Sequence, residues 1–265
     1  MKTRMRHFSK RVRHGTSHVL CGVLVALGCG GLLVPGALTA GAEKSTDATS
    51  DGKPPAREMQ GLPLAFFDNF DSENAARWEP SDPKAWKIIE QNGNGLYSQF
   101  QQSQVKTPVR SPFNRALVKD LVIGDFVLDV KLQSTIKDYD HRDMCLFFGF
   151  QDQAHLYYVH FGKKADDHAN QIFIVNNEPR KKISATSTAG TPWTDGWHHA
   201  RVVRMIESGT IEVFFDDMQK PVMTATDKTF LWGQVGIGTF DDTGNFDDVI
   251  VYGKKVERPK AQTNK

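Results

Sequence analysis

Side chains that could bind or react gather around one apolar segment in the middle of the chain. Arg142 and Asp143 directly precede a strand-like run, and His160 ends the apolar segment 156–159. Because successive side chains of a strand point to opposite faces, Tyr158 and His160 share one face. If these runs pair as successive hairpins, Arg142 or Asp143 comes near His160. The spacing therefore predicts a groove that contains an acid, a guanidinium, an imidazole and a phenol.

Such a set of side chains suits a polyhydroxylated ligand. Carboxylates and guanidinium groups bind neighbouring hydroxyls in fork geometry, and an aromatic face stacks on a sugar ring. A second aromatic candidate for stacking follows Pro192 in a loop that we expect to be exposed. The alternative is a solvent-facing strand edge with ordinary charge pairs. We assign carbohydrate-binding roles to Arg142, Asp143, Tyr158, His160 and Trp193.

Other chemistries find less support in the residues. Glycosidases need two carboxylates about 5–10 Å apart, and no predicted strand carries two Glu at alternating spacing, although a pair drawn from Asp143, Asp166 and Asp167 stays open. The run Trp197-His198-His199 places adjacent imidazoles on opposite strand faces, which disfavours zinc, and Trp197 is expected in the core. The glycines of 233–238 lie on a strand rather than before a helix, which excludes a dinucleotide fingerprint.

The elements that position these residues are predicted to be short strands. Between polar ends lie β-branched and aromatic runs separated by turn residues, without a convincing amphipathic helix. Asn92-Gly93 between two such runs predicts a hairpin. Many short antiparallel strands in one domain imply a sandwich or barrel. The predicted strands are 86–89, 96–98, 124–132, 146–150, 156–161, 171–175, 200–205, 211–215, 234–239 and 248–252.

The first 42 residues predict export. Residues 1–18 are basic and polar, residues 19–40 are apolar and small, and Ala40-Gly41-Ala42 fits a signal-peptidase site. The alternative is an uncleaved N-terminal membrane anchor. We expect a secreted or periplasmic protein of the cell envelope, without a membrane contact after cleavage. The predicted segments are a signal peptide (1–42), a flexible linker (43–61), one domain (62–255) and a polar tail (256–265).

Charge and cysteine content narrow the partners. The chain has 33 Lys and Arg and 31 Asp and Glu, but six of the basic residues and none of the acids lie in residues 1–42. Residues 43–265 thus hold 27 basic and 31 acidic residues, a net of −4, which gives no reason to propose nucleic acid as a partner. Cys145 is the one cysteine after the signal segment, and its apolar neighbours predict a buried, inert thiol.

The order of several motifs resembles a known superfamily. These are Phe66-Phe67-Asp68-Asn69-Phe70, a Trp before a Gly-rich hairpin, Gly196-Trp197-His198-His199, Gly233 to Gly238, and Asn245 to Val251. Together they resemble the concanavalin A-like lectin/glucanase jelly roll over residues 64–253. This superfamily includes laminin-G-like modules, family 16 glucanases and the secreted domain-of-unknown-function-1080 proteins associated with 3-keto-glycoside hydrolysis. The resemblance implies an all-β sandwich of two antiparallel sheets, and it implies little about activity because the fold hosts lectins, adhesion modules and hydrolases.

The resemblance also implies a structural calcium ion that joins the first strand to the last. The matching positions are Asp68 and Asn69 at the start and Asp247 near the end, and Gly95 would add a carbonyl. The alternative is that both acids accept backbone N–H groups. The acidic pair Asp241-Asp242 is given less weight, because acidic pairs in loops are usually solvated.

The sequence as a whole favours an exported, calcium-stabilised β-sandwich that binds a polysaccharide or glycan. The first alternative is an enzyme that acts on glycosides, glucanase-like or 3-keto-glycoside hydrolase-like. The second is a non-catalytic adhesion or structural module.

Overall fold

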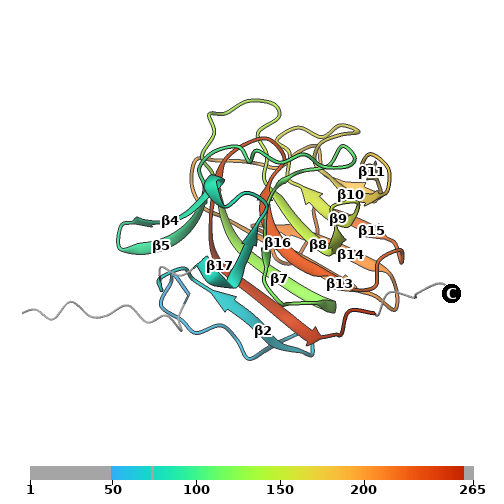
Figure 1. Ribbon diagram of the computed structural model, residues 1–265, viewed down its shortest axis with the longest axis horizontal. Helices are drawn as coiled ribbons and strands as arrows, with labels where there is room; N and C mark the ends of the chain where they lie inside the picture. Colours follow the sequence, from blue (N-terminus) through green and yellow to red (C-terminus); the bar gives the residue numbers. More distant parts are fainter. Residues whose placement is uncertain (1–48, 73–74, 260–265) are drawn as a thin grey trace, which may run out of the picture. The chain divides into compact units, whose positions relative to one another are not determined.

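The computed structural model describes residues 49–72 and 75–259, and these residues form a sandwich of two antiparallel sheets (Figure 1). The predicted all-β jelly roll is confirmed. Two 3₁₀ turns, η1 (Ala75–Arg77) and η2 (Pro83–Ala85), accompany the strands. The strands are β1 (Glu58–Met59), β2 (Leu62–Asp68), β3 (Trp78–Pro80), β4 (Trp86–Gln91), β5 (Asn94–Gln99), β6 (Asn114–Val118), β7 (Ile123–Ser134), β8 (Cys145–Asp152), β9 (His155–His160), β10 (Gln171–Asn176), β11 (Lys181–Lys182), β12 (Ser184–Ser187), β13 (His198–Met205), β14 (Thr210–Phe215), β15 (Met223–Thr226), β16 (Gln234–Thr239) and β17 (Gly244–Lys255).

The larger sheet has the order β1-β2-β17-β7-β13-β14-β15-β12, and the hairpin β4–β5 joins it through β17. Strand β17 pairs with β5 along Gly244 to Phe246 and with β2 along Val249 to Tyr252. Between these two stretches its register against β7 shifts, and Asp248 has a φ of 45°. A bulge of this kind bends a strand and lets it change partner.

The smaller sheet has the order β11-β10-β9-β8-β16-β6-β3. Its strand β16 carries Gly236 and Gly238 on one face and core residues on the other. A Cβ on Gly238 would lie 1.9 Å from the carbonyl oxygen of Asn114, and one on Gly236 would lie 2.4 Å from that of Ala116. Glycine is therefore required where β16 passes β6 this closely.

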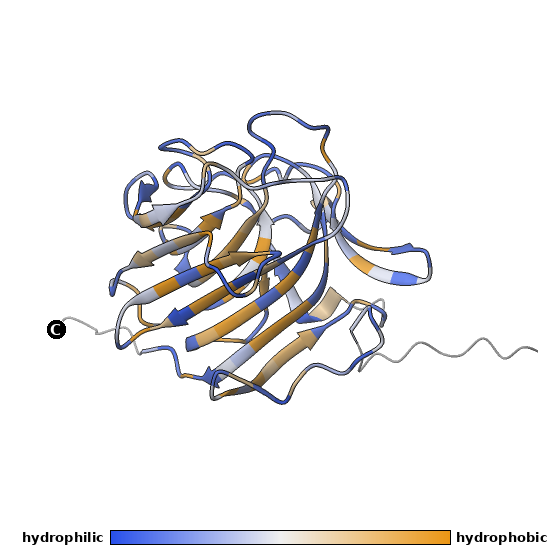
Figure 2. Ribbon diagram, turned by 180° about the vertical axis from the view of Figure 1, so that it is seen from behind, coloured by the Kyte–Doolittle hydropathy of each residue, from blue (hydrophilic) through white to orange (hydrophobic). Residues whose placement is uncertain are grey.

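The core lies between the two sheets and follows the alternation of the strands (Figure 2). From β7 of the larger sheet, Leu128 and Val130 point inward. Phe148 and Val159 meet them from the smaller sheet. Fully burying each of these side chains contributes roughly 1.5–3 kcal/mol to folding.

The outer face of the smaller sheet is also apolar. Cys145, Phe147, Tyr158 and Phe173 are at most 1% exposed on this face, and Phe240 from a loop packs against them. The central strands of the smaller sheet are therefore apolar on both faces, and part of the outer face is covered by loop residues. Cys145 is buried as expected, and burial raises the pKa of its thiol well above the usual value.

The predicted segments at the chain ends lie partly outside the described residues. Residues 1–42, the predicted signal peptide, and residues 260–265 of the predicted tail fall outside them. Within the predicted linker 43–61, Glu58–Met59 pairs with β2, and the amide of Ser50 donates to Asp248 Oδ1 at 2.8 Å. Among the described residues, the structure contains no helix of the length and hydropathy that crossing a membrane requires.

Candidate functional site

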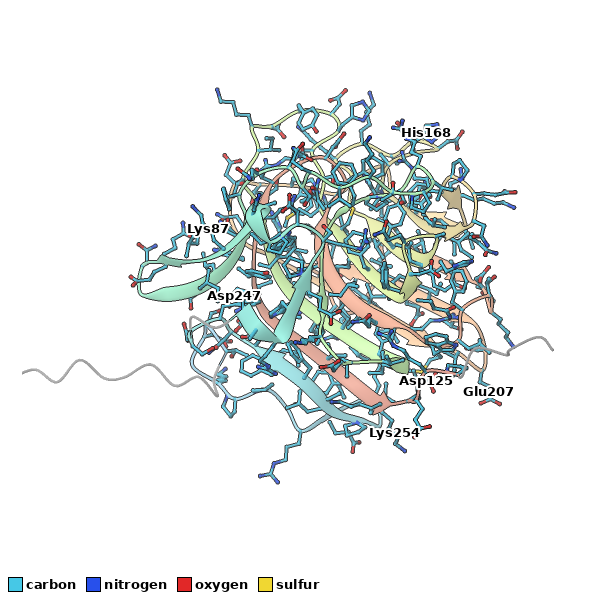
Figure 3. All side chains as sticks on the ribbon, viewed as in Figure 1. Lys87, Asp125, His168, Glu207, Asp247 and Lys254 are labelled. Carbon is cyan, nitrogen blue, oxygen red and sulfur yellow. The ribbon has the colours of Figure 1, made fainter. Side chains whose placement is uncertain are left out.

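A cavity of 530 Å³ opens where loops surround the outer face of the smaller sheet. We call it the polar cavity. Two of the predicted site residues, Asp143 and His160, line it, and His168 marks its rim among the loops beside β9 and β10 (Figure 3). Its other lining residues include Arg110, His141, Asp166, Arg180, Phe240 and Asp241.

Asp143 lies two residues before β8 and is 1% exposed. Its Oδ1 accepts from the amide of Phe240 at 2.7 Å, and its own amide donates to Asp242 Oδ2 at 2.7 Å. Its Oδ2 is buried and has no protein partner. Burial, and then the negative charge of Asp242, raises the pKa of Asp143 well above its ordinary value. An unpartnered buried oxygen is costly, which makes this one a candidate contact for a ligand.

His160 ends β9 opposite Cys145 of β8, and this pairing brings its ring toward Asp143. The amide of Asn170 donates to His160 Nδ1 at 3.3 Å. Burial, and then the positive charge of Arg180, lowers the pKa of His160 to about 3. The ring is therefore neutral near pH 7, and since Nδ1 accepts, the proton sits on Nε2. Nε2 lies 3.8 Å from Asp143 Oδ2, which is too long for a direct hydrogen bond.

Arg180 and Tyr158 add further unpartnered groups beneath the polar cavity. The guanidinium of Arg180 stacks 4.1 Å from the ring centroid of Phe240, and its Nη2 donates to the carbonyl of His168 at 3.4 Å. Its Nε and Nη1 are buried without a partner, and so is the hydroxyl of Tyr158. Burial raises the pKa of Tyr158 well above 10, so the hydroxyl keeps its proton.

The structure corrects the stacking role predicted for Tyr158. Its ring lies between Phe147, with centroids 6.1 Å apart, and Phe173, with centroids 5.0 Å apart. Both ring faces are therefore taken by protein, because the outer face of the smaller sheet carries a continuous aromatic row. Tyr158 is fully buried and is not among the residues that line the polar cavity, so it is not placed to stack on a sugar.

Arg142 also departs from its predicted role. Although it precedes Asp143, its side chain is 1% exposed and does not line the polar cavity. Its Nε donates to Ser134 Oγ at 3.1 Å, and its Nη1 lies 3.0 Å from Asp195 Oδ1. Arg142 thus anchors the loop before β8 through these contacts, whereas Asp143 lines the cavity.

The two tryptophans around residue 195 exchange their expected environments. Trp193, expected to be exposed, is 8% exposed, and its Nε1 donates to the carbonyl of Phe161 at 2.8 Å. Its ring meets His198 and Phe215 edge-on, with centroids 5.3 and 5.1 Å away. Trp197, expected in the core, is 37% exposed. Both expectations are wrong, and Trp193 is not placed to stack on a sugar.

The predicted calcium residues lie together where β2 ends and β5 begins. Gly95 allows β5 to pass this turn, because a Cβ there would lie 2.3 Å from the carbonyl oxygen of Phe70. Asp68 accepts from the amide of Phe70 at 3.0 Å and from Trp78 Nε1 at 2.9 Å. Both oxygens of Asp68 are thus engaged by N–H donors, which matches the alternative considered from the sequence, and calcium at Asp68 stays a prediction.

The other predicted ligands are also hydrogen-bonded. Asn69 Nδ2 donates to Asp71 Oδ2 at 2.9 Å. Asp247 Oδ1 accepts from the amide of Asp248, and its Oδ2 accepts from Asn94 Nδ2, both at 2.7 Å. Burial, and then the charge of Asp248, raises the pKa of Asp247 to about 7. A cation beside Asp247 would relieve this, so Asp247 fits a ligand better than Asp68 does, and calcium there stays a prediction.

Within residues 49–72 and 75–259, one group offers three carboxylates to a single ion. Asp143, Asp241 and Asp242 each contribute an oxygen within 4.8 Å of the others. Asp242 already accepts from Tyr139 and from the amide of Asp143, both at 2.7 Å. Nothing in the spacing of Asp241-Asp242 in the sequence places this pair against Asp143, so the group becomes visible only in the folded chain.

No family model and no curated protein matches the chain. Among solved structures, it is similar to the carbohydrate-binding module CBM66 from Bacillus subtilis, with 17% identity over 67% of this chain and 96% of that one and a TM-score of 0.47. The chain is also similar to domain 4 of the extracellular arabinanase AbnA from Geobacillus stearothermophilus, in complex with arabinotriose. The identity is 9% over 74% of this chain and 95% of that one, and the TM-score is 0.49. Winged bean acidic lectin complexed with methyl-α-D-galactose is similar with 11% identity over 72% of this chain and 99% of that one, and the TM-score is 0.48.

Proposed function

We propose that this domain is an exported carbohydrate-binding module and that a sugar binds in the polar cavity. The observation that carries the proposal is the pair formed by His160 Nε2–H and Asp143 Oδ2, which face each other at 3.8 Å. His160 Nε2–H is a donor, whereas Asp143 Oδ2 accepts when the carboxyl is ionised and donates when it holds its proton. A sugar hydroxyl can both donate and accept, so it can bridge the two groups in either state of Asp143.

The remaining lining residues suit the rest of such a ligand. The planar stack of Arg180 on Phe240 gives a flat surface, and Arg110 and Asp166 offer further hydrogen-bonding groups at the rim. A volume of 530 Å³ falls within the range of small-molecule sites, roughly 300–1,000 Å³. The basic and apolar start of the chain supports export, which would place the module where polysaccharides occur.

A glycan array tests this proposal directly. The purified protein should bind one class of glycan, and Asp143→Asn and His160→Ala should each weaken binding at least tenfold. His155→Ala is the matched control, because it removes a histidine from the opposite end of the same strand β9. Equal binding by all four proteins would show that the sugar binds elsewhere. The absence of binding to any glycan would favour the adhesion or structural module.

A second candidate function, a glycoside-active enzyme, is favoured by the acids of the polar cavity. Asp143 holds its proton to a higher pH than an ordinary carboxyl, and Asp241 offers an oxygen within 4.8 Å. Acid-assisted glycoside cleavage uses a carboxyl group that holds its proton beside a second carboxyl group. Product release from polysaccharides and from 3-keto-glycosides, the substrates suggested by the domain-1080 resemblance, tests this. Asp143→Asn should abolish turnover if the enzyme exists.

The proposal includes a structural calcium ion bound by Asp247 and by oxygens of the adjoining turn. Asp247 is 2% exposed and lies beside a second carboxylate, Asp248. A divalent cation would neutralise this pair, and calcium prefers carboxylate and carbonyl oxygens. A thermal melt with and without a chelator tests this, and an unchanged melting temperature removes the ion from the proposal.

A further inference from the structure

We infer that the protein has a second glycan-binding site, a groove on the outer face of the larger sheet where a neutral sugar stacks on Trp197. This tryptophan groove is independent of the polar cavity. It has a volume of 460 Å³. It is lined by Gln91, Asn92 and Asn94 of the β4–β5 hairpin, Lys131 and Gln133 of β7, Asp247 of β17, and Trp197 before β13.

Strand register explains why these side chains meet. Gln133 pairs with Asn245, and Lys131 pairs with Asp247, across β7 and β17. The pair between them, Leu132 and Phe246, points into the core, so its neighbours point outward. On the other side of β7, His198 pairs with Leu132 and also points inward, which directs Trp197 to the outer face next to Gln133.

The β4–β5 hairpin forms the opposite wall of the tryptophan groove. It projects from the larger sheet beside β17, close to the labelled Asp247 (Figure 3). Its turn residues Asn92 and Gly93 have positive φ values of 57° and 77°, which close the hairpin tightly. The amide side chains of Gln91 and Asn92, both exposed, therefore stand across the groove from Trp197.

The chemistry of this lining fits a sugar rather than another ligand. Amide side chains donate and accept through fixed planar groups, and an exposed indole offers an apolar face to the C–H side of a pyranose ring. Asn245 Nδ2 donates to Gln133 Oε1 at 3.1 Å, which fixes the orientation of the Gln133 amide in the groove.

The charge of the groove points to a neutral glycan. Its single cation, among the described lining residues, is Lys131, and this ammonium already lies 3.1 Å from Asp248 Oδ2. No arginine lines the groove in the described part of the chain, so no guanidinium group is present there to bind the carboxylate of an acidic sugar. The groove and the polar cavity lie on different sheets, and Asp247 and His168 mark separate parts of the molecule (Figure 3). A module with two such sites can hold one long polysaccharide or two chains with increased avidity.

Native gel electrophoresis of the full protein through soluble neutral polysaccharides tests the inference. Separate gels would contain an arabinan, a galactan, a fructan and a β-glucan. Trp197→Ala should weaken retardation at least tenfold in apparent Kd on the retarding polymer, while Trp197→Tyr should keep most of it. Phe100→Ala is the matched control, because Phe100 is a similarly exposed aromatic residue, 41%, outside the groove. Melting temperatures verify that each variant is folded.

The outcomes separate this inference from the proposed function. Loss of retardation in Trp197→Ala, with further loss when His160→Ala is added, supports both sites. Loss in Trp197→Ala with normal retardation in His160→Ala supports the groove and rejects the polar cavity. Normal retardation of Trp197→Ala on every polymer overturns the inference, and so does the absence of retardation of the unaltered protein.

Discussion

The neutral state of His160 predicts how the stability of the protein depends on pH. Burial lowers the pKa of His160 to about 3, whereas an unfolded histidine titrates near 6.5. Between about pH 3 and pH 6.5, His160 binds a proton in the unfolded chain but not in the folded protein. Stability is therefore full above about pH 6.5 and is lost as the pH falls through this window.

The size of the effect follows from the two pKa values. At pH 5 the difference in proton binding lowers the free energy of unfolding by about 2 kcal/mol relative to pH 7.5. Replacing His160 with Gln removes this contribution while it keeps a polar side chain of similar size. Between pH 7.5 and 5, urea unfolding should show that the unaltered protein loses about 2 kcal/mol more than His160→Gln does.

The comparison uses the change with pH, so a uniform loss of stability in the variant does not affect it. His155→Gln serves as the control, because it removes a histidine at the more exposed end of β9, where the ring contacts Asp152. This control should follow the unaltered protein. If His160→Gln also follows it, His160 is not held neutral. The assignment of a donor Nε2–H in the polar cavity then fails as well.

Three further perturbations have expected outcomes. The pKa of Asp247 is raised to about 7, so the folded state keeps a proton that the unfolded state loses, and stability should fall as the pH rises from about 4 through 7, on the order of 4 kcal/mol. Asp247→Asn should flatten this slope in urea titrations, and millimolar calcium should do the same if the ion binds. Tyr158→Phe removes a buried, unpartnered hydroxyl, so it should raise the free energy of unfolding by about 1 kcal/mol in urea titrations. Gly236→Ala would place a Cβ 2.4 Å from the carbonyl oxygen of Ala116 and should lower stability by about 1–3 kcal/mol in the same unfolding assay.

The fold was predictable because its determinants are local. Strand alternation places Leu128 and Val130 toward the core, and Asn92-Gly93 specifies the tight hairpin between β4 and β5. These signals depend on neighbours one to four residues apart. The partner change of β17 is different, because the bulge at Asp248 appears only when β5 and β2 compete for the same strand.

The polar cavity was predictable only in part. Asp143 and His160 lie at the ends of β8 and β9, two strands that are consecutive in the chain, so hairpin pairing brings them together. Arg110, Arg180 and Asp241 come from three separate loops, and no spacing in the sequence relates them. A residue that reaches a site from an irregular loop leaves no periodic pattern in the sequence.

The alternation of side chains along β13 determines that Trp197 lies outside the core, and the predictions for the two tryptophans did not use it. Along β13, Ala200 and Val202 face the core. Every second residue counted from them must therefore face inward, and the residues between must face outward. His198 follows this rule by stacking on Phe215 with centroids 4.8 Å apart, and Trp197 is then directed outward. The motif was interpreted as core because it contains tryptophan, a judgement of residue type. The period of the strand was the stronger constraint, since moving Trp197 inward would turn every other residue of β13 to the wrong face of the sheet.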